Sequence, residues 1–375
     1  MTVPIRVVVA DDSPFVCRLM TSYLQSSPDL QVVGTVLDGA QAVESVAELR
    51  PDVVTLDLEM PEMDGLEALG HIMRECPTPV VLVSGVSHQA AVTTLRAIDM
   101  GAVDFILKYT PSVDTNPEFL RQEIIAKVRA ASRIKVVRSL RPRRPHDKEG
   151  AASLPFLLEG TSTTPLAHPG AEPEAQTGDS LPPVADNVIV VGASTGGPVA
   201  LRELLGNLPA DFRSPIIIVQ HIPASFTHVL ASQLDQQVPL KVREAKTGDR
   251  LQPGLALLAP GGRHVLLRPN LIVELNQGPE IGGHRPSIDV TMQSAAQTYG
   301  ARTKGVVLTG MGEDGLLGLV SIRAKGGKTF AQDAASCVVN GMPQRAIERG
   351  VVDHVAPPAK IAQLLKADQT RIREK

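Results

Sequence analysis

The chain has 375 residues, of which 43% are hydrophobic and 21% are charged, and its formal net charge at pH 7 is −3. This is a globular composition, and a chain of this length exceeds what one hydrophobic core usually supports, so we predict two domains. The lack of a basic excess and of tryptophan, with only 3% aromatic residues, argues against a nucleic-acid-binding surface.

The three cysteines, Cys17, Cys76 and Cys337, are far apart in the sequence and form no C-x-x-C pair. We therefore expect neither a disulfide framework nor a cysteine metal site, which fits a reducing compartment. The N-terminus lacks the basic start and long apolar stretch of a signal peptide, and no apolar run approaches the roughly 18 residues of a spanning helix. The sequence predicts a cytoplasmic protein without membrane insertion.

The first 132 residues alternate short apolar runs with amphipathic stretches. The runs read IRVVVA, QVVGTV, DVVTLDL, PVVLVS and AVDFIL, and each has the length of one strand. Continuous apolar strands separated by helices indicate a parallel sheet whose two faces are both covered. We predict that residues 1–132 form a flavodoxin-like α/β domain with a doubly wound, parallel, five-stranded sheet.

Polar residues follow the ends of these strands. Asp11 and Asp12 come after the first run and Asp57 ends the third, while Ser84 ends the fourth and Lys108 follows the fifth. Because ligands of open parallel sheets bind beyond the carboxyl ends of the strands, these side chains are expected to converge. Three gathered carboxylates repel one another without a cation, and oxygen ligands favour Mg²⁺. The pattern predicts that Asp57 is a nucleophile toward a phosphoryl group, whose oxygens contact Ser84 and Lys108.

The motifs VVVADDSPF, DLEMPEMDG, VVLVSGVS and GAVDFILK resemble the receiver domain of two-component response regulators. The resemblance implies that Asp57 is the phospho-acceptor. It implies that Asp11 and Asp12 bind the metal together with Asp57. The residues that would relay phosphorylation are Ser84, Phe105 and Lys108. The sequence departs from the family at Tyr109, because a proline usually follows the lysine. We therefore expect the loop after Lys108 to have a different shape.

Between residues 133 and 186 the apolar periodicity disappears. Arg, Pro, Glu, Thr, Ser and Gly dominate there, as in RPRRPHDKEG and TTPLAHPGAEPEAQTGDSLPP. Such a segment cannot offset its ordering entropy by burial, so we predict a flexible, proline-rich linker. Its basic run, residues 138–148, is expected to be solvated, although docking on an acidic partner is the alternative.

Residues 187–370 contain the further apolar runs NVIVVG, SPIIIVQH and TKGVVLTG, which predict a second, doubly wound and mostly parallel α/β domain. The first run continues into GASTG at residues 192–196. This is the G-x-S-x-G pattern of a strand-to-helix turn that exposes a nucleophilic serine. A dinucleotide-binding loop would need glycine in place of Ser194, and the ending of a P-loop is missing.

Candidate partners of Ser194 also follow apolar strands. His221 comes directly after the second run, and Asp314 follows the third through a glycine-rich turn. We predict that His221 takes the serine proton and that Asp314 orients the imidazole and stabilises its charged form. Backbone N–H groups of Thr195 and Met311 are the candidate donors to an oxyanion.

The other eight histidines, His284 among them, are expected to have surface or packing roles. No H-x-x-x-H spacing surrounds His221, so we expect no zinc and no cofactor at the serine site. Cys337 is expected to be a small buried residue and not a nucleophile.

The order Ser, His, Asp along the chain differs from that of α/β-hydrolases. Instead, IVVGASTGGP, IIIVQHIPASFT, LLAPGGRH, GHRPSIDV, VVLTGMGEDG and ASCVVNGMP resemble the catalytic domain of chemotaxis protein-glutamate methylesterases. The resemblance implies hydrolysis of glutamate methyl esters on the cytoplasmic helices of chemoreceptors, with release of methanol, and deamidation of receptor glutamines. It also implies a chemotaxis-type histidine kinase as phosphodonor, and it includes Arg285, which we expect to contact substrate.

The domain order and the resemblance imply that the unphosphorylated receiver covers the Ser194 cleft and that phosphorylation of Asp57 weakens this contact. The sequence leaves two alternatives open. One is a receiver-controlled serine esterase or amidase with a non-receptor substrate, since a triad does not identify the acyl group. The other is a non-enzymatic output domain that binds a partner such as DNA, against which the net charge and the lack of a helix-turn-helix pattern argue.

Overall fold

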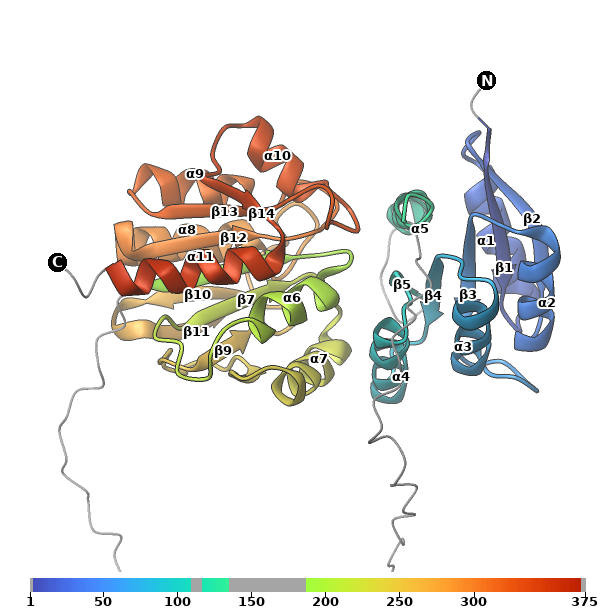
Figure 1. Ribbon diagram of the computed structural model, residues 1–375, viewed down its shortest axis with the longest axis horizontal. Helices are drawn as coiled ribbons and strands as arrows, with labels where there is room; N and C mark the ends of the chain where they lie inside the picture. Colours follow the sequence, from blue (N-terminus) through green and yellow to red (C-terminus); the bar gives the residue numbers. More distant parts are fainter. Residues whose placement is uncertain (1–2, 109–116, 135–186, 372–375) are drawn as a thin grey trace, which may run out of the picture. The chain divides into compact units, whose positions relative to one another are not determined.

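Two parallel β-sheets covered by helices, together with a β-hairpin, form the part of the chain that the computed structural model describes (Figure 1). The described residues are 3–108, 117–134 and 187–371. Among them, no helix is both long enough and apolar enough to cross a membrane. The predicted linker, residues 133–186, lies almost entirely outside the described residues, so the domain boundaries stay predictions.

The N-terminal sheet has five parallel strands in the order β2-β1-β3-β4-β5. The strands are β1 (Ile5–Ala10), β2 (Leu30–Val36), β3 (Val53–Asp57), β4 (Val80–Ser84) and β5 (Asp104–Leu107). The helices are α1 (Pro14–Gln25), α2 (Gly39–Leu49), α3 (Gly65–Glu75), α4 (His88–Asp99) and α5 (Pro117–Ala131). This order is that of a flavodoxin-like fold, so the predicted five-stranded sheet is confirmed.

The strand register gathers the predicted polar residues at one edge of this sheet. The pairing of β1 with β3 aligns Asp11 with Asp57, and Lys108 N donates to Ser84 O at 2.7 Å just beyond the paired ends of β4 and β5. The helices that follow the strands begin with side-chain caps, from Ser13, Asp38, Asp64 and Ser87. Each cap satisfies an N–H of the first helical turn and so fixes the loop between strand and helix.

The C-terminal sheet has seven parallel strands in the order β14-β13-β12-β6-β7-β9-β8. They are β6 (Val188–Ala193), β7 (Ile216–Gln220), β8 (Lys241–Glu244), β9 (Leu255–Leu258), β12 (Thr303–Val307), β13 (Lys328–Gln332) and β14 (His354–Ala356). The helices are α6 (Gly197–Gly206), α7 (Ala224–Gln237), α8 (Ile288–Tyr299), α9 (Leu316–Ala324), α10 (Met342–Glu348) and α11 (Pro358–Arg371). The hairpin pairs β10 (His264–Arg268) with β11 (Ile272–Asn276), and the 3-10 turns are η1 (Pro269–Leu271) and η2 (Gly300–Arg302). The predicted second parallel α/β fold is confirmed.

Alternate residues of β6 enter the two halves of the core of this fold. Ile189 and Val191 lie in the cluster that includes residues of α6, α7 and α11. Val188 and Val190 lie in the cluster that includes residues of α8 and α9. A strand covered on both faces has no polar side, which explains the continuous apolar run in the sequence. This two-sided burial fixes the end of β6, from which the serine turn starts.

A buried ion pair ties α11 to the sheet. Lys304 on β12 has a side chain that is 2% exposed, and its Nζ lies 2.5 Å from Asp368 Oδ2 on α11. Lys328 on β13 pairs with the same carboxylate, but its side chain is 47% exposed. Burial alone would raise the pKa of Asp368, and hydrogen bonds from the two lysines lower it instead. Because a buried charge without a partner is costly and an exposed pair contributes little, Asp368 acts mainly by compensating Lys304.

We expect Asp368→Ala to lower the free energy of unfolding by about 3 kcal/mol, because the buried Lys304 ammonium then loses the carboxylate that lies 2.5 Å from it. The matched control is Lys328→Ala, which removes only the exposed partner and should cost less than about 1 kcal/mol. Urea denaturation of the full chain, followed by circular dichroism, measures both changes. Equal losses in the two variants would contradict this account of the pair.

Candidate active site

Ser194 lies on the tight turn between β6 and α6. Its backbone N–H donates to Thr309 O at 3.0 Å, and its carbonyl accepts from Gly197 N at 2.8 Å and from Gln220 Nε2 at 2.9 Å. Gly196 at the helix N-cap has a φ of 75°, a left-handed conformation that glycine adopts without strain. Residues at the ends of both neighbouring strands therefore hold the turn, which presents the serine at the carboxyl edge of the sheet.

The chain approaches Ser194 closely at Gly310, which follows β12. A Cβ atom at position 310 would lie 2.7 Å from Ser194 Cβ and would also overlap Met342 Sδ. The Gly310 carbonyl accepts from Gly341 N at 3.0 Å and from Met342 N at 2.9 Å, so this backbone cannot easily shift. Position 310 therefore requires glycine. The close approach also brings the peptide that carries the Met311 N–H next to Ser194.

His221 follows β7 and reaches across the end of β6. Ala193 is paired with Gln220, and His221 N donates to Ala193 O at 3.0 Å, so the histidine and Ser194 start at neighbouring strand ends. Nε2 of the ring lies 2.8 Å from Asp314 Oδ2. Nδ1 is buried and has no hydrogen-bond partner among the residues that the structure describes. Nδ1 is thus the nitrogen left to accept a proton from Ser194.

The strand order β12-β6-β7 accounts for this orientation of the ring. Neighbouring strands lie about 4.8 Å apart, and β6, with Ser194 at its end, lies between β7 and β12. Asp314 follows β12, and His221 follows β7, so the imidazole has to extend across β6 to reach the carboxylate. It does so with Nε2, the ring nitrogen farther from the backbone. Nδ1 is then left on the side of β6. In the chymotrypsin-type triad the aspartate binds Nδ1, so the two nitrogens of His221 have exchanged places relative to that triad.

The Asp314 carboxylate is bound at the N-terminus of α8. Its Oδ1 accepts from Ser287 Oγ and from Asp289 N, each at 2.9 Å, and its Oδ2 accepts from Ile288 N at 2.7 Å. The first N–H groups of a helix lack helical partners and carry partial positive charge, so they stabilise an anion. Burial alone would raise the pKa of Asp314, but His221 and these backbone donors lower it to about 2. Asp314 is therefore ionised at neutral pH and held in one orientation.

Asp289, in the first turn of α8, supports the loop that carries Asp314. Its Oδ1 accepts from Gly315 N at 2.9 Å and from Gly318 N at 2.7 Å, at the start of α9. Burial raises the pKa of Asp289 to about 6, although these backbone donors oppose the shift. Asp289 lies within the motif GHRPSIDV, but no role is predicted for it from the sequence, because its spacing from Asp314 does not indicate a contact.

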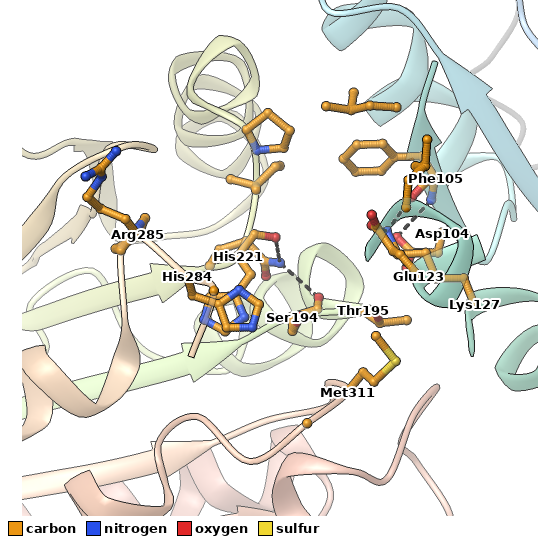
Figure 2. Close-up of a pocket in the computed structure, with 18 of the residues that line it drawn as sticks. Asp104, Phe105, Glu123, Lys127, Ser194, Thr195, His221, His284, Arg285 and Met311 are labelled. Carbon is orange, nitrogen blue, oxygen red and sulfur yellow. Dashed lines mark hydrogen bonds and ion pairs between the residues drawn. The ribbon is translucent and has the colours of Figure 1, made fainter. Parts of the chain in front are cut away.

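His284 lies against the face of His221. The ring centroids are 3.8 Å apart and the ring planes differ by 14°, and Figure 2 shows the stacked pair beside Ser194. Burial and, to a smaller extent, the neighbouring His221 lower the pKa of His284 to about 4. From the sequence, only a surface or packing role is expected for His284, since no pattern connects it with His221, which lies far earlier in the chain.

Arg285, which we expected to contact substrate, is engaged within its own loop. Its Nη1 donates to Gly278 O at 3.0 Å, and its Nη2 lies 4.0 Å from Glu280 Oε1. The Arg285 carbonyl accepts from Gly262 N at 2.8 Å. Figure 2 shows the guanidinium directed away from Ser194. These contacts support a role in holding the loop, and substrate contact by Arg285 stays a prediction.

The two residues expected to supply oxyanion donors flank the serine. Thr195 immediately precedes the N-cap of α6, and its carbonyl accepts from Thr309 Oγ1 at 3.0 Å. Met311 follows Gly310, and Figure 2 shows both Thr195 and Met311 near Ser194. Backbone donors fixed in this way do not have to reorganise during a reaction, which is the requirement for stabilising an oxyanion. Their role stays a prediction.

Cys337 has the character of an unreactive thiol. Burial raises its pKa to about 12, and the nearby carboxylate of Asp333 contributes in the same direction. Because the thiolate is the nucleophilic form of cysteine, a thiol that stays protonated is a poor nucleophile. Cys337 is partly buried and not fully buried as expected, and its lack of a catalytic role stays a prediction.

At the carboxyl edge of the N-terminal sheet, Asp11, Asp12 and Asp57 place ligand atoms within 4.8 Å of one another. Lys108 Nζ lies 2.6 Å from Asp57 Oδ2 and 3.3 Å from Asp11 Oδ2. Burial raises the pKa of Asp57 to about 6 and also raises that of Asp11, and Lys108 opposes both shifts only in part. Crowded carboxylates that are costly to ionise fit a hard divalent cation such as Mg²⁺.

The remaining predicted relay residues lie on the neighbouring strands. Ser84 Oγ lies 2.6 Å from Thr94 Oγ1, which belongs to α4. Phe105 lies on β5, where its carbonyl accepts from Lys127 Nζ at 2.5 Å. The hydroxyl of Ser84 therefore already has a partner on a helix, which a phosphate oxygen would have to replace. Tyr109, the departure from the receiver pattern, lies outside the described residues.

Comparison with protein-family models finds two matches in this chain. The model described as CheB methylesterase matches residues 189–365, and the model described as response regulator receiver domain matches residues 7–115. Among curated proteins, the chain is 41% identical to the protein-glutamate methylesterase/protein-glutamine glutaminase of Symbiobacterium thermophilum, over 96% of both chains. It is also 41% identical to the protein of that name from Pyrococcus horikoshii, over 96% of this chain and 92% of the relative.

Two solved structures from Thermotoga maritima are similar to separate parts of the chain. The CheB methylesterase catalytic domain is 42% identical, with a TM-score of 0.47, and the match covers 48% of this chain and 98% of that one. The response regulator domain of CheB is also 42% identical, with a TM-score of 0.32, and the match covers 35% of this chain and 98% of that one.

We expect Gly310→Ala to lower the free energy of unfolding by about 1–3 kcal/mol, because the added methyl group overlaps Ser194 and Met342 in a tightly packed site. The matched control is Gly206→Ala, where a Cβ meets no atom within 4 Å and which should leave stability nearly unchanged. Thermal unfolding of both variants measures the difference. A Gly310→Ala protein as stable as the control would contradict the close approach to the serine turn.

Proposed function

Because the chain belongs to the family of protein-glutamate methylesterases/protein-glutamine glutaminases, we propose that it is a serine hydrolase that acts on chemoreceptors. It would demethylate glutamate methyl esters and deamidate glutamines on their cytoplasmic helices. The observation that carries the proposal is the His221–Asp314 hydrogen bond of 2.8 Å at the end of the strand next to the Ser194 turn. Esters and amides both present a carbonyl carbon to a nucleophile, so one serine can serve both reactions.

In the first half-reaction, His221 Nδ1 takes the Ser194 proton while Oγ attacks the carbonyl carbon of the ester. The N–H groups of Thr195 and Met311 donate to the oxyanion of the tetrahedral intermediate. Asp314 stays ionised, since its pKa is about 2, and it stabilises the imidazolium through Nε2. His221 then gives the proton to the leaving oxygen, so that methanol departs and the acyl group remains on Ser194.

In the second half-reaction, water takes the place of methanol. His221 Nδ1 accepts a proton from the water, whose oxygen attacks the acyl carbon. The bond to Ser194 Oγ breaks, the proton returns to the serine, and a glutamate side chain is released. When the substrate is glutamine, ammonia leaves in the first half-reaction and the second is unchanged. Both half-reactions use side chains of this chain and water.

The receiver part is proposed to control this activity. Asp57 would accept a phosphoryl group from a chemotaxis-type histidine kinase, and Lys108 and Ser84 would then contact the phosphate oxygens. Asp11, Asp12 and Asp57 would hold Mg²⁺, which would neutralise part of the charge during the transfer. The negative charge gained at Asp57 and the loss of the Ser84 contact to α4 provide the local change on which regulation depends.

The proposal implies two protein partners. Chemoreceptors are the substrates and a histidine kinase is the phosphodonor, and both would meet the chain in the cytoplasm, without nucleic acid or membrane insertion. A receiver-controlled esterase or amidase with another substrate is the second candidate, and no contact in the site favours it. Family membership disfavours a non-enzymatic output domain.

We expect Ser194→Ala to abolish methanol release from methylated receptor membranes, with a loss of at least about 10³-fold, because the substitution removes the attacking hydroxyl. Gas chromatography of the released methanol measures the rate. Cys337→Ala is the control, since this thiol has no part in the mechanism, and it should keep most of the activity. Undiminished release by a folded Ser194→Ala protein would refute the proposal.

We expect Asp57→Asn to keep the basal rate of methanol release and to lose stimulation by acetyl phosphate, because an amide cannot accept the phosphoryl group. Asp38→Asn is the control, since asparagine also caps a helix, and it should remain stimulated. Removal of Mg²⁺ with EDTA should abolish stimulation of the wild type without lowering its basal rate. Full stimulation of Asp57→Asn would exclude phosphorylation at this residue.

A further inference from the structure

The mechanism so far gives no role to His284, although its ring covers one face of the proposed general base. The rings of His284 and His221 are 3.8 Å apart between centroids and nearly parallel, at 14°. The edge of His221 that carries Nε2 is bound by Asp314. The edge that carries Nδ1 has no protein partner among the described residues. The stack therefore leaves Nδ1 of His221 without a hydrogen bond, although this atom is buried, while it restrains tilting of the ring.

A rigid turn presents His284 to the site. Ile281 N donates to His284 O at 3.1 Å and His284 N donates to Ile281 O at 3.0 Å. The two residues between them, Gly282 and Gly283, have φ angles of 60° and 79°. Positive φ at both central residues is the signature of a tight type I′ turn, which glycine forms without strain. Arg285, the next residue, donates to Gly278 O, which ties this turn to the preceding part of the loop.

His284 is the neutral member of the pair at neutral pH. The Asp314 carboxylate binds His221, whereas the Arg285 guanidinium is directed to Gly278 O. Burial and the neighbouring imidazole lower the pKa of His284 to about 4, so it is neutral at pH 7. When His221 takes the serine proton, a neutral ring therefore faces a cationic one.

We propose that His284 is a positioning residue for the general base. Its stacked ring holds the His221 imidazole in the plane that joins Asp314 to Ser194, and its π face stabilises the positive charge that forms on His221 during attack. A neutral aromatic face attracts a cation placed above it, and the attraction is larger when water is excluded. Because His221 carries the charge only as the tetrahedral intermediate forms, this contact stabilises the transition state more than the ground state. The inference rests on the proposed function of Ser194 and His221.

Three substitutions at position 284 separate this role from its alternatives. His284→Phe keeps a planar π face and removes both ring nitrogens. His284→Leu fills the space with an apolar side chain but has no π face. His284→Ala removes the ring. We expect kcat for methanol release to fall about 10- to 30-fold in the Ala and Leu variants and less than about 3-fold in Phe, with KM changed little in all three.

A second measurement does not depend on the identity of the substrate. A fluorophosphonate modifies an activated serine, so its rate of reaction with Ser194 in the full-length protein reports how well His221 serves as base. We expect the same order, with wild type and Phe fast and Leu and Ala slow. If the wild type reacts with the probe but releases no methanol from receptors, the proposed substrate is wrong, and the labelling rates still decide the role of His284.

Two outcomes would overturn the inference. Equal rates for Leu and Phe would mean that His284 only fills space. A Phe variant as slow as Ala would mean that a ring nitrogen, through a hydrogen bond or a proton, carries the effect. If the Ala variant fails to fold, the comparison of Phe with Leu still distinguishes these outcomes, because both keep the volume of the side chain.

Discussion

The geometry of the proposed catalytic residues depends on how one carboxylate, that of Asp314, is bound. Asp314 is buried, and it remains ionised because the N-terminus of α8 and the His221 ring surround it with hydrogen-bond donors. The position of this carboxylate sets the direction in which the His221 side chain extends. The same contacts hold the loop that leads to α9. Without these donors, burial would favour the protonated acid, which could neither orient the imidazole nor stabilise its positive charge.

The order of the parallel strands brings the bound Asp314 carboxylate, His221 and Ser194 to the same edge of the sheet. The serine strand lies between the strands that carry the histidine and the aspartate, so a single imidazole reaches across it. The same principle operates in the N-terminal sheet, where residues at the ends of neighbouring strands bring Asp11, Asp57 and Lys108 together. In both folds, apolar strands buried by helices determine where polar side chains emerge.

Both sites contain buried ionisable groups whose charged forms are destabilised by burial. Burial raises the pKa of Asp57 and of Asp289 to about 6, and it lowers that of His284 to about 4. Each pKa shift means that the charged form of the group is less stable in the fold than in water. Such groups persist where neighbouring donors, a cation or a reaction intermediate offsets the cost, which is why perturbed groups gather at functional sites.

The sequence by itself determined the five strands of the N-terminal sheet, the three C-terminal strands β6, β7 and β12, the two parallel folds, and the candidate residues Ser194, His221 and Asp314. Buried strands are continuous apolar runs, and the polar residues that follow them stand out. Only the tertiary structure decided which nitrogen of His221 meets Asp314, since this follows from the order of β12, β6 and β7. It also decided that His284 stacks on His221, that Arg285 is bound within its own loop, and that Lys304 is paired with Asp368. These contacts join residues that are distant in the chain or depend on the shape of a loop, so local spacing carries no information about them.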